Sequence, residues 1–196
     1  MTHGEALICA EGLLAAISPF CHRCEIAGSI RREKPEVKDI EIVAIPKWEP
    51  RPDTANLFGE DVDTNLLHIW ALSGDCPVRW IKPGTAEIVD WRPKPDGRYW
   101  RGLIGGIKLD LFITDPMRWG TTMLIRTGSA DFSHAVASHA LHQGYKFHEG
   151  GLWRTVGGVP LTQIETADEL DVFRELGMRW IEPPCRIDGR DVKGKQ

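Results

Sequence analysis

Residues 39–45 form the most informative segment of this chain, and they read Asp39-Ile40-Glu41-Ile42-Val43-Ala44-Ile45. Successive side chains of a β-strand point to opposite faces, so an extended conformation places Asp39 and Glu41 on one face and Ile40 on the other. The apolar run that follows is typical of a strand buried on both faces. The segment therefore predicts a core strand that presents two carboxylates side by side.

A third acid lies in a similar extended segment, Lys108-Leu109-Asp110-Leu111-Phe112. If the two strands are neighbours, Asp39, Glu41 and Asp110 converge, and three carboxylates repel one another unless cations hold them. Two divalent metals about 3.5–4 Å apart neutralise such a set and brace both oxygens of an in-line phosphoryl displacement. We therefore expect these three residues to be catalytic acids that bind two ions of Mg²⁺ or Mn²⁺.

The pair Gly28-Ser29 precedes the first strand and is followed by Arg31 and Arg32. Glycine allows the backbone to approach a phosphate without a Cβ in the way, and arginine supplies fixed positive charge with bidentate donors. A turn of this composition, placed before paired acids, indicates a site for nucleotidyl transfer.

Composition and charge limit the class of protein. The chain has 196 residues, 42% hydrophobic and 27% charged, which is typical of a soluble globular protein. It contains no run of about 18 consecutive apolar residues and begins without the features of a secretion signal. Five cysteines form no disulfide framework, and Cys21-x-x-Cys24 lacks a second ligand pair for zinc, so we expect free thiols in the cytoplasm.

Secondary-structure signals change near residue 117. Thr2 and Glu5 form a capping box for a helix that ends before Pro19. The elements expected next are a strand over 24–27, a loop or flap over 46–62, a helix over 65–73, a strand over 77–80, a second loop over 82–97 and a hairpin over 99–114.

The second part of the chain is expected to be smaller and mixed. Ser133 predicts the N-cap of a helix that runs to residue 143, and a second hairpin follows over 145–156. Thr166 predicts the N-cap of a last helix that ends at Gly177. The polar segment 188–196 is expected to be flexible.

Taken together, these motifs resemble the family X DNA polymerases, the group that includes DNA polymerase beta and the small viral repair polymerases. Residues 28–32, Gly-Ser-Ile-Arg-Arg, align with the family's Gly-Ser-aromatic-Arg-Arg motif, and the three acids align with its metal ligands. Residues 127–132 match the Thr-Gly-Ser segment that begins the thumb, and residues 165–186 resemble the closing Leu-Gly … Glu-Pro-x-x-Arg block. The resemblance extends over nearly the whole chain.

The resemblance implies an α+β fold with a nucleotidyltransferase palm, a mixed sheet with helices on one side, over residues 1–117. A small α/β thumb would follow over 118–187. Because few residues precede Gly28, the resemblance implies the minimal palm-plus-thumb form of the small viral members, without the lyase domain and most of the fingers.

The resemblance also assigns roles to individual residues. Those expected to bind the nucleotide are Gly28, Ser29, Arg32, Lys38, Gly128, Ser129 and Ser133. Contacts with DNA are expected from Lys108, Arg126 and Arg154.

Three features, at four positions, depart from the family pattern. Glu41 stands where an aspartate is usual, and Ser133 aligns with an asparagine that contacts the base edge. Ile125-Arg126 replaces an aromatic pair that checks the 2′ position of the sugar, so we expect altered discrimination against ribonucleotides.

The expected activity is transfer of a nucleotide from a dNTP to the 3′-hydroxyl of a primer-template or gapped DNA, as in short-gap repair, by a monomer that needs no membrane. Two alternatives remain. A nucleotidyltransferase that acts on a protein, an RNA or a small molecule agrees better with the net charge of −4. A non-catalytic module that binds DNA ends is the other, although all three acids are present.

Overall fold

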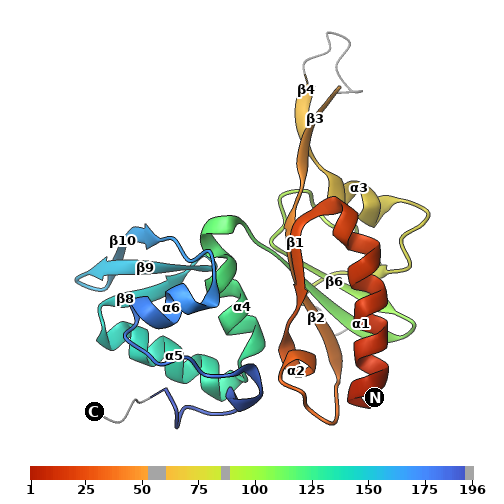
Figure 1. Cartoon of the computed structure of the whole chain (residues 1–196). Helices are drawn as coiled ribbons and strands as arrows, with labels where there is room; N and C mark the ends of the chain where they lie inside the picture. The colour runs from red at the N-terminus through yellow and green to blue at the C-terminus, as the bar shows by residue number, and fades with distance from the viewer. Residues whose placement is uncertain (53–60, 85–88, 193–196) are drawn as a thin grey trace.

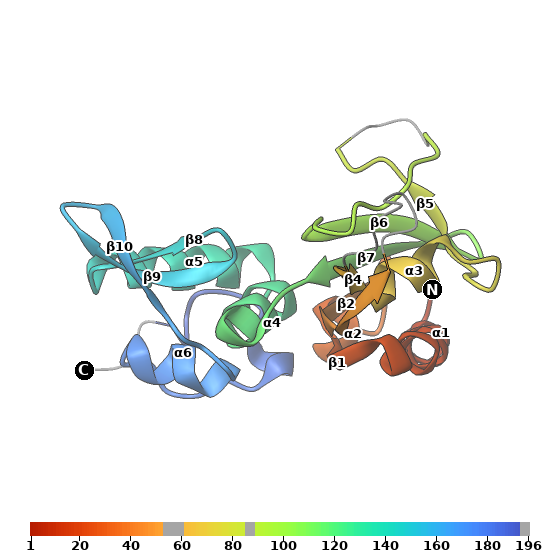
Figure 2. The same ribbon diagram turned by 90° about the horizontal axis from the view of Figure 1, so that it is seen from above.

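The chain folds into two lobes, described here from a computed structural model that covers residues 1–52, 61–84 and 89–192. Figure 1 shows the N-terminal lobe, built from residues up to 117, beside a smaller C-terminal lobe. Helix α4 (Trp119–Thr127) lies on the side of the C-terminal lobe that faces the first (Figure 2).

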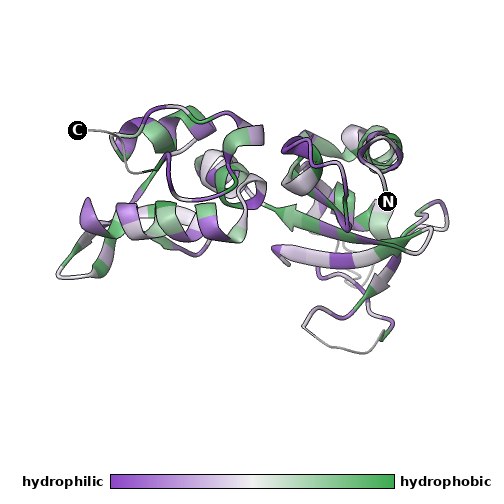
Figure 3. Cartoon of the chain, turned by 90° about the horizontal axis from the view of Figure 1, so that it is seen from below, coloured by the Kyte–Doolittle hydropathy of each residue, from purple (hydrophilic) through white to green (hydrophobic). Residues whose placement is uncertain are grey.

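A five-stranded sheet forms the centre of the N-terminal lobe. Its strands, in spatial order, are β1 (Cys21–Ile26), β2 (Asp39–Pro46), β7 (Ile107–Ile113), β6 (Tyr99–Ile104) and β5 (Arg79–Ile81). Strands β2 and β7 are parallel, and every other pair is antiparallel. The expected α+β class with a mixed sheet is therefore confirmed, and Figure 3 shows hydrophobic stretches along these strands.

Helices α1 (His3–Ile17) and α3 (Leu66–Leu72) cover one face of this sheet. The predicted capping box starts α1, where the Thr2 side chain accepts from the backbone of Glu5 and Glu5 reaches back to Thr2. Both helices share a hydrophobic core with Ile40 and Ile42, which are fully buried. The opposite face carries the acids and, toward the far ends of β2 and β7, a small core with α4.

A two-stranded ribbon replaces the loop that the sequence predicts over 46–62. Strands β3 (Trp48–Pro52) and β4 (Asp61–Asn65) pair antiparallel and extend away from the lobe (Figure 1), while residues 53–60 lie outside the described part. The prolines of β3 predict a loop, but Pro50 and Pro52 are two residues apart. Their missing N–H groups therefore fall on the same edge of the strand, which an edge position tolerates.

The C-terminal lobe packs helices against a three-stranded sheet. It contains α5 (Ala130–His142), β8 (Tyr145–His148), β9 (Gly151–Val156), β10 (Val159–Ile164) and α6 (Glu169–Glu175), with sheet order β10-β9-β8. Single 3₁₀ turns lie at η1 (Ser18–Phe20), η2 (Pro116–Arg118) and η3 (Pro183–Cys185). The hairpin expected over 145–156 is thus extended by a third strand that the sequence reading missed.

Two predicted helix starts are wrong. Ser129, not Ser133, is the N-cap of α5, because its hydroxyl accepts from the backbone N–H of Phe132. Asp168, not Thr166, begins α6 through a capping box with Asp171.

The segment expected to be flexible packs against the C-terminal lobe as far as the structure describes it. Val192 is 2% exposed within the lobe's core, and Gly189 lies against Ala135 of α5. In the described ranges, no helix has the length and apolar character needed to cross a bilayer.

Candidate active site

The register of β2 and β7 brings the three predicted acids to one face of the sheet. Glu41 lies directly opposite Asp110 across the parallel pair, and Asp39 lies opposite Lys108. Asp39 and Glu41 alternate with Ile40, which is buried against the helices, so all three carboxylates are on the face that α1 and α3 leave uncovered. Burial raises the pKa of Asp39, and the charge of Asp110 raises it further.

Glu41 is the acid most affected by its surroundings. Burial raises its pKa to about 7, and the charges of Asp39 and Asp110 act in the same direction. The guanidinium groups of Arg32 and Arg126 oppose this rise. Glu41 is therefore a buried carboxyl group whose ionised form is disfavoured first by burial and then by the neighbouring acids.

Asp110 differs from the other two acids because it already has donors. Tyr99 Oη donates to Asp110 Oδ1 at 2.6 Å, and Arg101 donates through Nε to Oδ1 at 2.9 Å and through Nη2 to Oδ2 at 3.4 Å. Within residues 1–52, 61–84 and 89–192, no group of three or more His, Cys, Asp or Glu side chains is arranged to hold a metal ion. The backbone therefore places the three acids on one face of the sheet, while the Asp110 side chain is held by Arg101 and Tyr99.

The Gly28-Ser29 turn lies directly against these acids. Gly28 has φ of 63° and begins the one-turn helix α2 (Gly28–Arg31). The Ser29 Oγ and the Arg32 Nε are buried, and neither has a hydrogen-bond partner in the described part of the chain. Buried polar atoms normally have partners. A hydroxyl and a guanidinium N–H left open beside an acid cluster are the donors that a phosphate oxygen needs.

Two arginines of this turn connect it to the C-terminal lobe. Arg31 donates to Thr127 Oγ1 at 2.7 Å and to Glu169 Oε2 at 2.5 Å, and Arg32 donates to the Thr127 carbonyl. Glu169 also accepts from Arg186, which is fully buried. Sequence reasoning missed Glu169, which joins Arg31 of the N-terminal lobe to Arg186 of its own lobe. Arg186 belongs to the closing block, but nothing local marks its partner.

The predicted nucleotide-binding residues of the C-terminal lobe all have structural contacts. The Ser129 hydroxyl caps α5 and donates to the Ile187 carbonyl, and the Ser133 hydroxyl donates to the Ile125 carbonyl at 3.1 Å. Gly128 packs so closely that an added Cβ would lie 2.4 Å from Phe132. The backbone N–H groups of all three residues are also paired, with the carbonyls of Leu124, Arg186 and Ser129.

The C-terminal lobe is the part of the chain that matches a known protein family. Residues 122–187 match the DNA polymerase beta thumb family. The match spans about a third of the chain, includes both Thr127-Gly128-Ser129 and Arg186, and supports a relationship to the polymerases of the DNA polymerase beta type. Comparison with curated proteins gave no significant match.

The predicted DNA-binding residues are placed differently from one another. Lys108 is exposed on the face of the acids, and Lys38, which directly precedes β2, is also exposed. Arg126 lies between the thumb and the acids, with its guanidinium 4.0 Å from the centre of the Phe112 ring. Arg154 lies within the thumb, where it contacts Glu175 at 3.0 Å and Tyr145 at 2.9 Å, so its charge is already paired.

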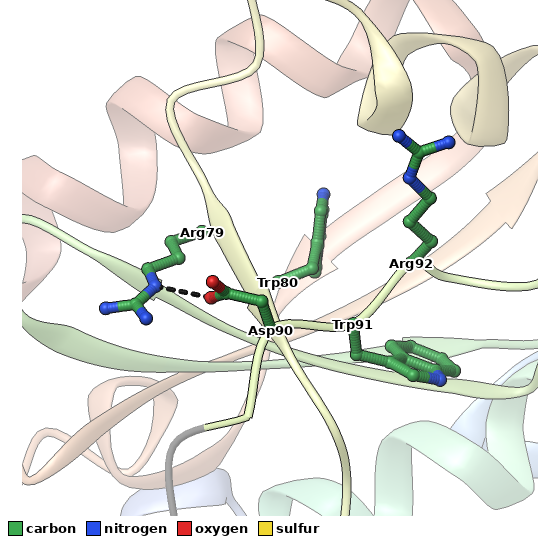
Figure 4. Close-up of a pocket in the computed structure, with 5 residues that line it drawn as sticks. All are labelled: Arg79, Trp80, Asp90, Trp91 and Arg92. Carbon is green, nitrogen blue, oxygen red and sulfur yellow. Dashed lines mark hydrogen bonds and ion pairs between the residues drawn. The ribbon is translucent and has the colours of Figure 1, made fainter.

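A hollow of about 570 Å³ lies at the β5 edge of the N-terminal sheet, where Ile81 and Asp90 form an isolated bridge. Figure 4 shows its lining, in which Arg79 forms an ion pair with Asp90 at 2.7 Å, and the side chains of Trp91 and Arg92 lie on the other side of Asp90. None of the three acids lines this hollow. Arg79 therefore provides a comparison for Arg101, as an arginine on the same sheet with a different partner.

Proposed function

We propose that this chain is a nucleotidyltransferase of the DNA polymerase beta type that adds nucleotides from dNTPs to a DNA 3′-hydroxyl. The observation that carries the proposal is the parallel register of β2 and β7. It places Glu41 opposite Asp110, with Asp39 on the same face, next to the open donors of Ser29 and Arg32. The thumb match supports a DNA acceptor rather than another hydroxyl.

The three acids fit a pair of divalent cations in charge and in backbone placement, provided that Asp110 leaves Arg101. Asp39, Glu41 and Asp110 would hold these ions, Mg²⁺ or Mn²⁺, which lower the pKa of the attacking hydroxyl and neutralise charge on the phosphates. Burial first, and then the charges of Asp39 and Asp110, raise the pKa of Glu41, and a bound cation would offset both effects by stabilising the ionised carboxylate.

The chain's own residues position the substrates. Ser29 and Arg32 would donate to the triphosphate, and exposed Lys38 lies close in sequence to Asp39. The backbone at Gly128 and Ser129 would support the sugar, since Arg31 and Arg32 tie this segment to the phosphate turn through Thr127. Lys108, exposed beside the acids, would contact the primer end. Positioning and charge stabilisation account for most of the rate in reactions of this kind.

The test is extension of a labelled primer by the full chain with Mg²⁺ or Mn²⁺, on gapped DNA and on a single-stranded primer. We expect extension on gapped DNA that stops when EDTA removes the metal. Asp110→Asn should abolish extension without changing the circular-dichroism spectrum, because it keeps the side-chain shape but removes the charge. Asp90→Asn, at the exposed edge of the same sheet, is the matched control and should remain active.

Two results would overturn the proposal. One is an Asp110→Asn protein that extends primers as fast as the wild type. The other is transfer of labelled nucleotide to protein or RNA in the absence of primer extension, which would favour a different acceptor for the same site.

A further inference from the structure

Arg101 and Asp110 form a cross-strand pair in the middle of the candidate site. They lie directly opposite each other on the antiparallel strands β6 and β7, so their side chains share the face of the acids. Arg101 contacts both carboxylate oxygens, and its guanidinium also lies 5.5 Å from the centre of the Tyr99 ring. The side chain of Asp110 is 12% exposed and that of Arg101 is 31% exposed.

The other two acids lack such partners. No hydrogen bond or ion pair reaches the carboxylate oxygens of Asp39 or Glu41 from any residue that the structure describes. Several cations act on the three acids at longer range, but in the described part of the chain only one of the three carboxylates accepts a direct hydrogen bond from a cationic side chain. That carboxylate, Asp110, is the one supplied by the neighbouring strand.

Resting on the function proposed above, we propose that Arg101 is a positioning residue that holds Asp110 in the metal-free protein and releases it when DNA phosphate and divalent cation bind together. A carboxylate whose two oxygens accept from one guanidinium has to give up that contact to become a metal ligand. Arg101 therefore weakens metal binding when it has no other anion to bind.

DNA supplies that other anion. Arg101 is partly exposed. Lys108 lies on the same face of the sheet, in β7, two residues before Asp110. A DNA backbone phosphate that binds Lys108 would also lie near the guanidinium of Arg101 once Arg101 has released Asp110. Arginine binds phosphate through the same bidentate geometry as it binds carboxylate. Binding of DNA and of metal would then strengthen each other by the same factor, because coupling between two sites is reciprocal.

The experiment measures free Mn²⁺ by electron paramagnetic resonance in titrations of the full chain, with and without gapped DNA whose primer ends in a dideoxynucleotide. In the wild type, DNA should tighten Mn²⁺ binding about tenfold, the factor expected for releasing one partly exposed, charge-assisted contact. Arg101→Gln should bind Mn²⁺ about tenfold tighter than the wild type without DNA, and DNA should add little. Arg101→Lys keeps the charge and should retain most of the coupling.

Arg79→Gln is the matched control, since it removes a paired arginine from the neighbouring strand β5 and leaves Asp110 untouched (Figure 4). Its Mn²⁺ affinity without DNA should equal that of the wild type. Thermal denaturation of each variant confirms that it is folded at the temperature of the titration.

The outcomes separate this inference from the function on which it rests. If the wild type binds Mn²⁺ and extends primers but Arg101→Gln binds Mn²⁺ equally or more weakly, Arg101 has only a structural role and the inference is overturned. The same conclusion follows if DNA tightens Mn²⁺ binding equally in both proteins. If the wild type binds no Mn²⁺ and extends no primer, the proposed function and the inference both fail.

Discussion

The carboxylate of Glu41 lies against the backbone of Gly28, so that a Cβ added to Gly28 would be 1.9 Å from Glu41 Oε2. Gly28 also has φ of 63°, a conformation that favours glycine. Two separate reasons therefore require glycine at this position. The close approach also explains how a glutamate fits at position 41, because its side chain, one methylene longer than that of aspartate, extends to the Gly28-Ser29 turn.

The first prediction concerns Gly28→Ala. The new methyl group displaces the Glu41 carboxylate, and a displacement of about 1 Å in an active site lowers the rate on the order of 100-fold. Primer extension under saturating dNTP measures this loss. Unfolding in urea should also show a loss of about 1–2 kcal/mol, because alanine is strained at positive φ.

Gly177→Ala separates the effect of backbone strain at positive φ from that of the steric clash with Glu41. Gly177 has φ of 62°, nearly that of Gly28, but an added Cβ there meets no atom within 4 Å. This variant should lose similar stability and keep its rate of extension. Equal activity of the two variants would show that the contact between Gly28 and Glu41 does not control the site.

A second prediction follows from the pKa of Glu41, which burial and the charges of Asp39 and Asp110 raise to about 7 from an ordinary 4.5. Between these two values the folded protein keeps a proton that the unfolded chain has released. The corresponding stability is fully present below the unfolded value and is lost as the pH rises through 7. Glu41→Gln has no charge to lose, so its free energy of unfolding relative to the wild type should rise by on the order of 2 kcal/mol from about pH 5 to about pH 8.

Urea denaturation in EDTA measures this difference in the free energy of unfolding. The contributions of most other titrating groups cancel, because they are the same in the two proteins. Adding Mg²⁺ should reduce it at high pH, because a bound cation stabilises the wild-type carboxylate and not the amide. A difference that stays constant with pH would contradict the assigned environment of Glu41.

The acids could be located from sequence because strand geometry determines them. Alternation fixes the face of Asp39 and Glu41, and a parallel neighbour with its own alternation fixes Asp110. The partner of Asp110 was also within reach. The two-residue Gly105-Gly106 turn pairs Ile104 with Ile107, and counting three residues back from Ile104 and three on from Ile107 pairs Arg101 with Asp110.

Other features could not be read from local patterns. Arg31 and Glu169 are 138 residues apart, and their contact depends on how α6 packs against α4. The start of α5 was misplaced because Ser129 and Ser133 are both good N-cap residues four positions apart, one turn of helix. The ribbon of β3 and β4 was missed because its prolines are loop signals unless the pairing edge is known.

A third prediction concerns Glu169, the acid shared by Arg31 and Arg186. Glu169 is 4% exposed and Arg186 is fully buried, so Glu169→Gln leaves the buried guanidinium of Arg186 without its counter-charge. Breaking a buried pair in this way costs about 3 kcal/mol. Urea denaturation should show that loss, whereas Asp188→Asn, which removes an exposed pair with Arg190, should have little effect.

A double variant tests whether the loss comes from the uncompensated charge. Combining Glu169→Gln with Arg186→Met removes both members of the pair, and its destabilisation should be smaller than the sum of the two single changes. Additive losses would mean that the two residues act independently.

The last prediction uses one substitution at two glycines. In α4, a Cβ added to Gly120 would lie 2.0 Å from the backbone oxygen of Asp168, at the start of α6. Backbone atoms cannot turn aside as a side chain can, so Gly120→Ala forces the two helices apart and lengthens the hydrogen bond from Gly120 N–H to the Thr166 carbonyl, now 2.7 Å. Overpacking of this kind costs about 2–3 kcal/mol.

In α1, Gly12 is exposed and an added Cβ meets no atom within 4 Å, so Gly12→Ala should instead raise the free energy of unfolding by about 0.5–1 kcal/mol through helix propensity. Urea denaturation of both variants checks the opposite signs, and a Gly120→Ala protein as stable as the wild type would show that α4 and α6 are not packed as closely as this contact requires.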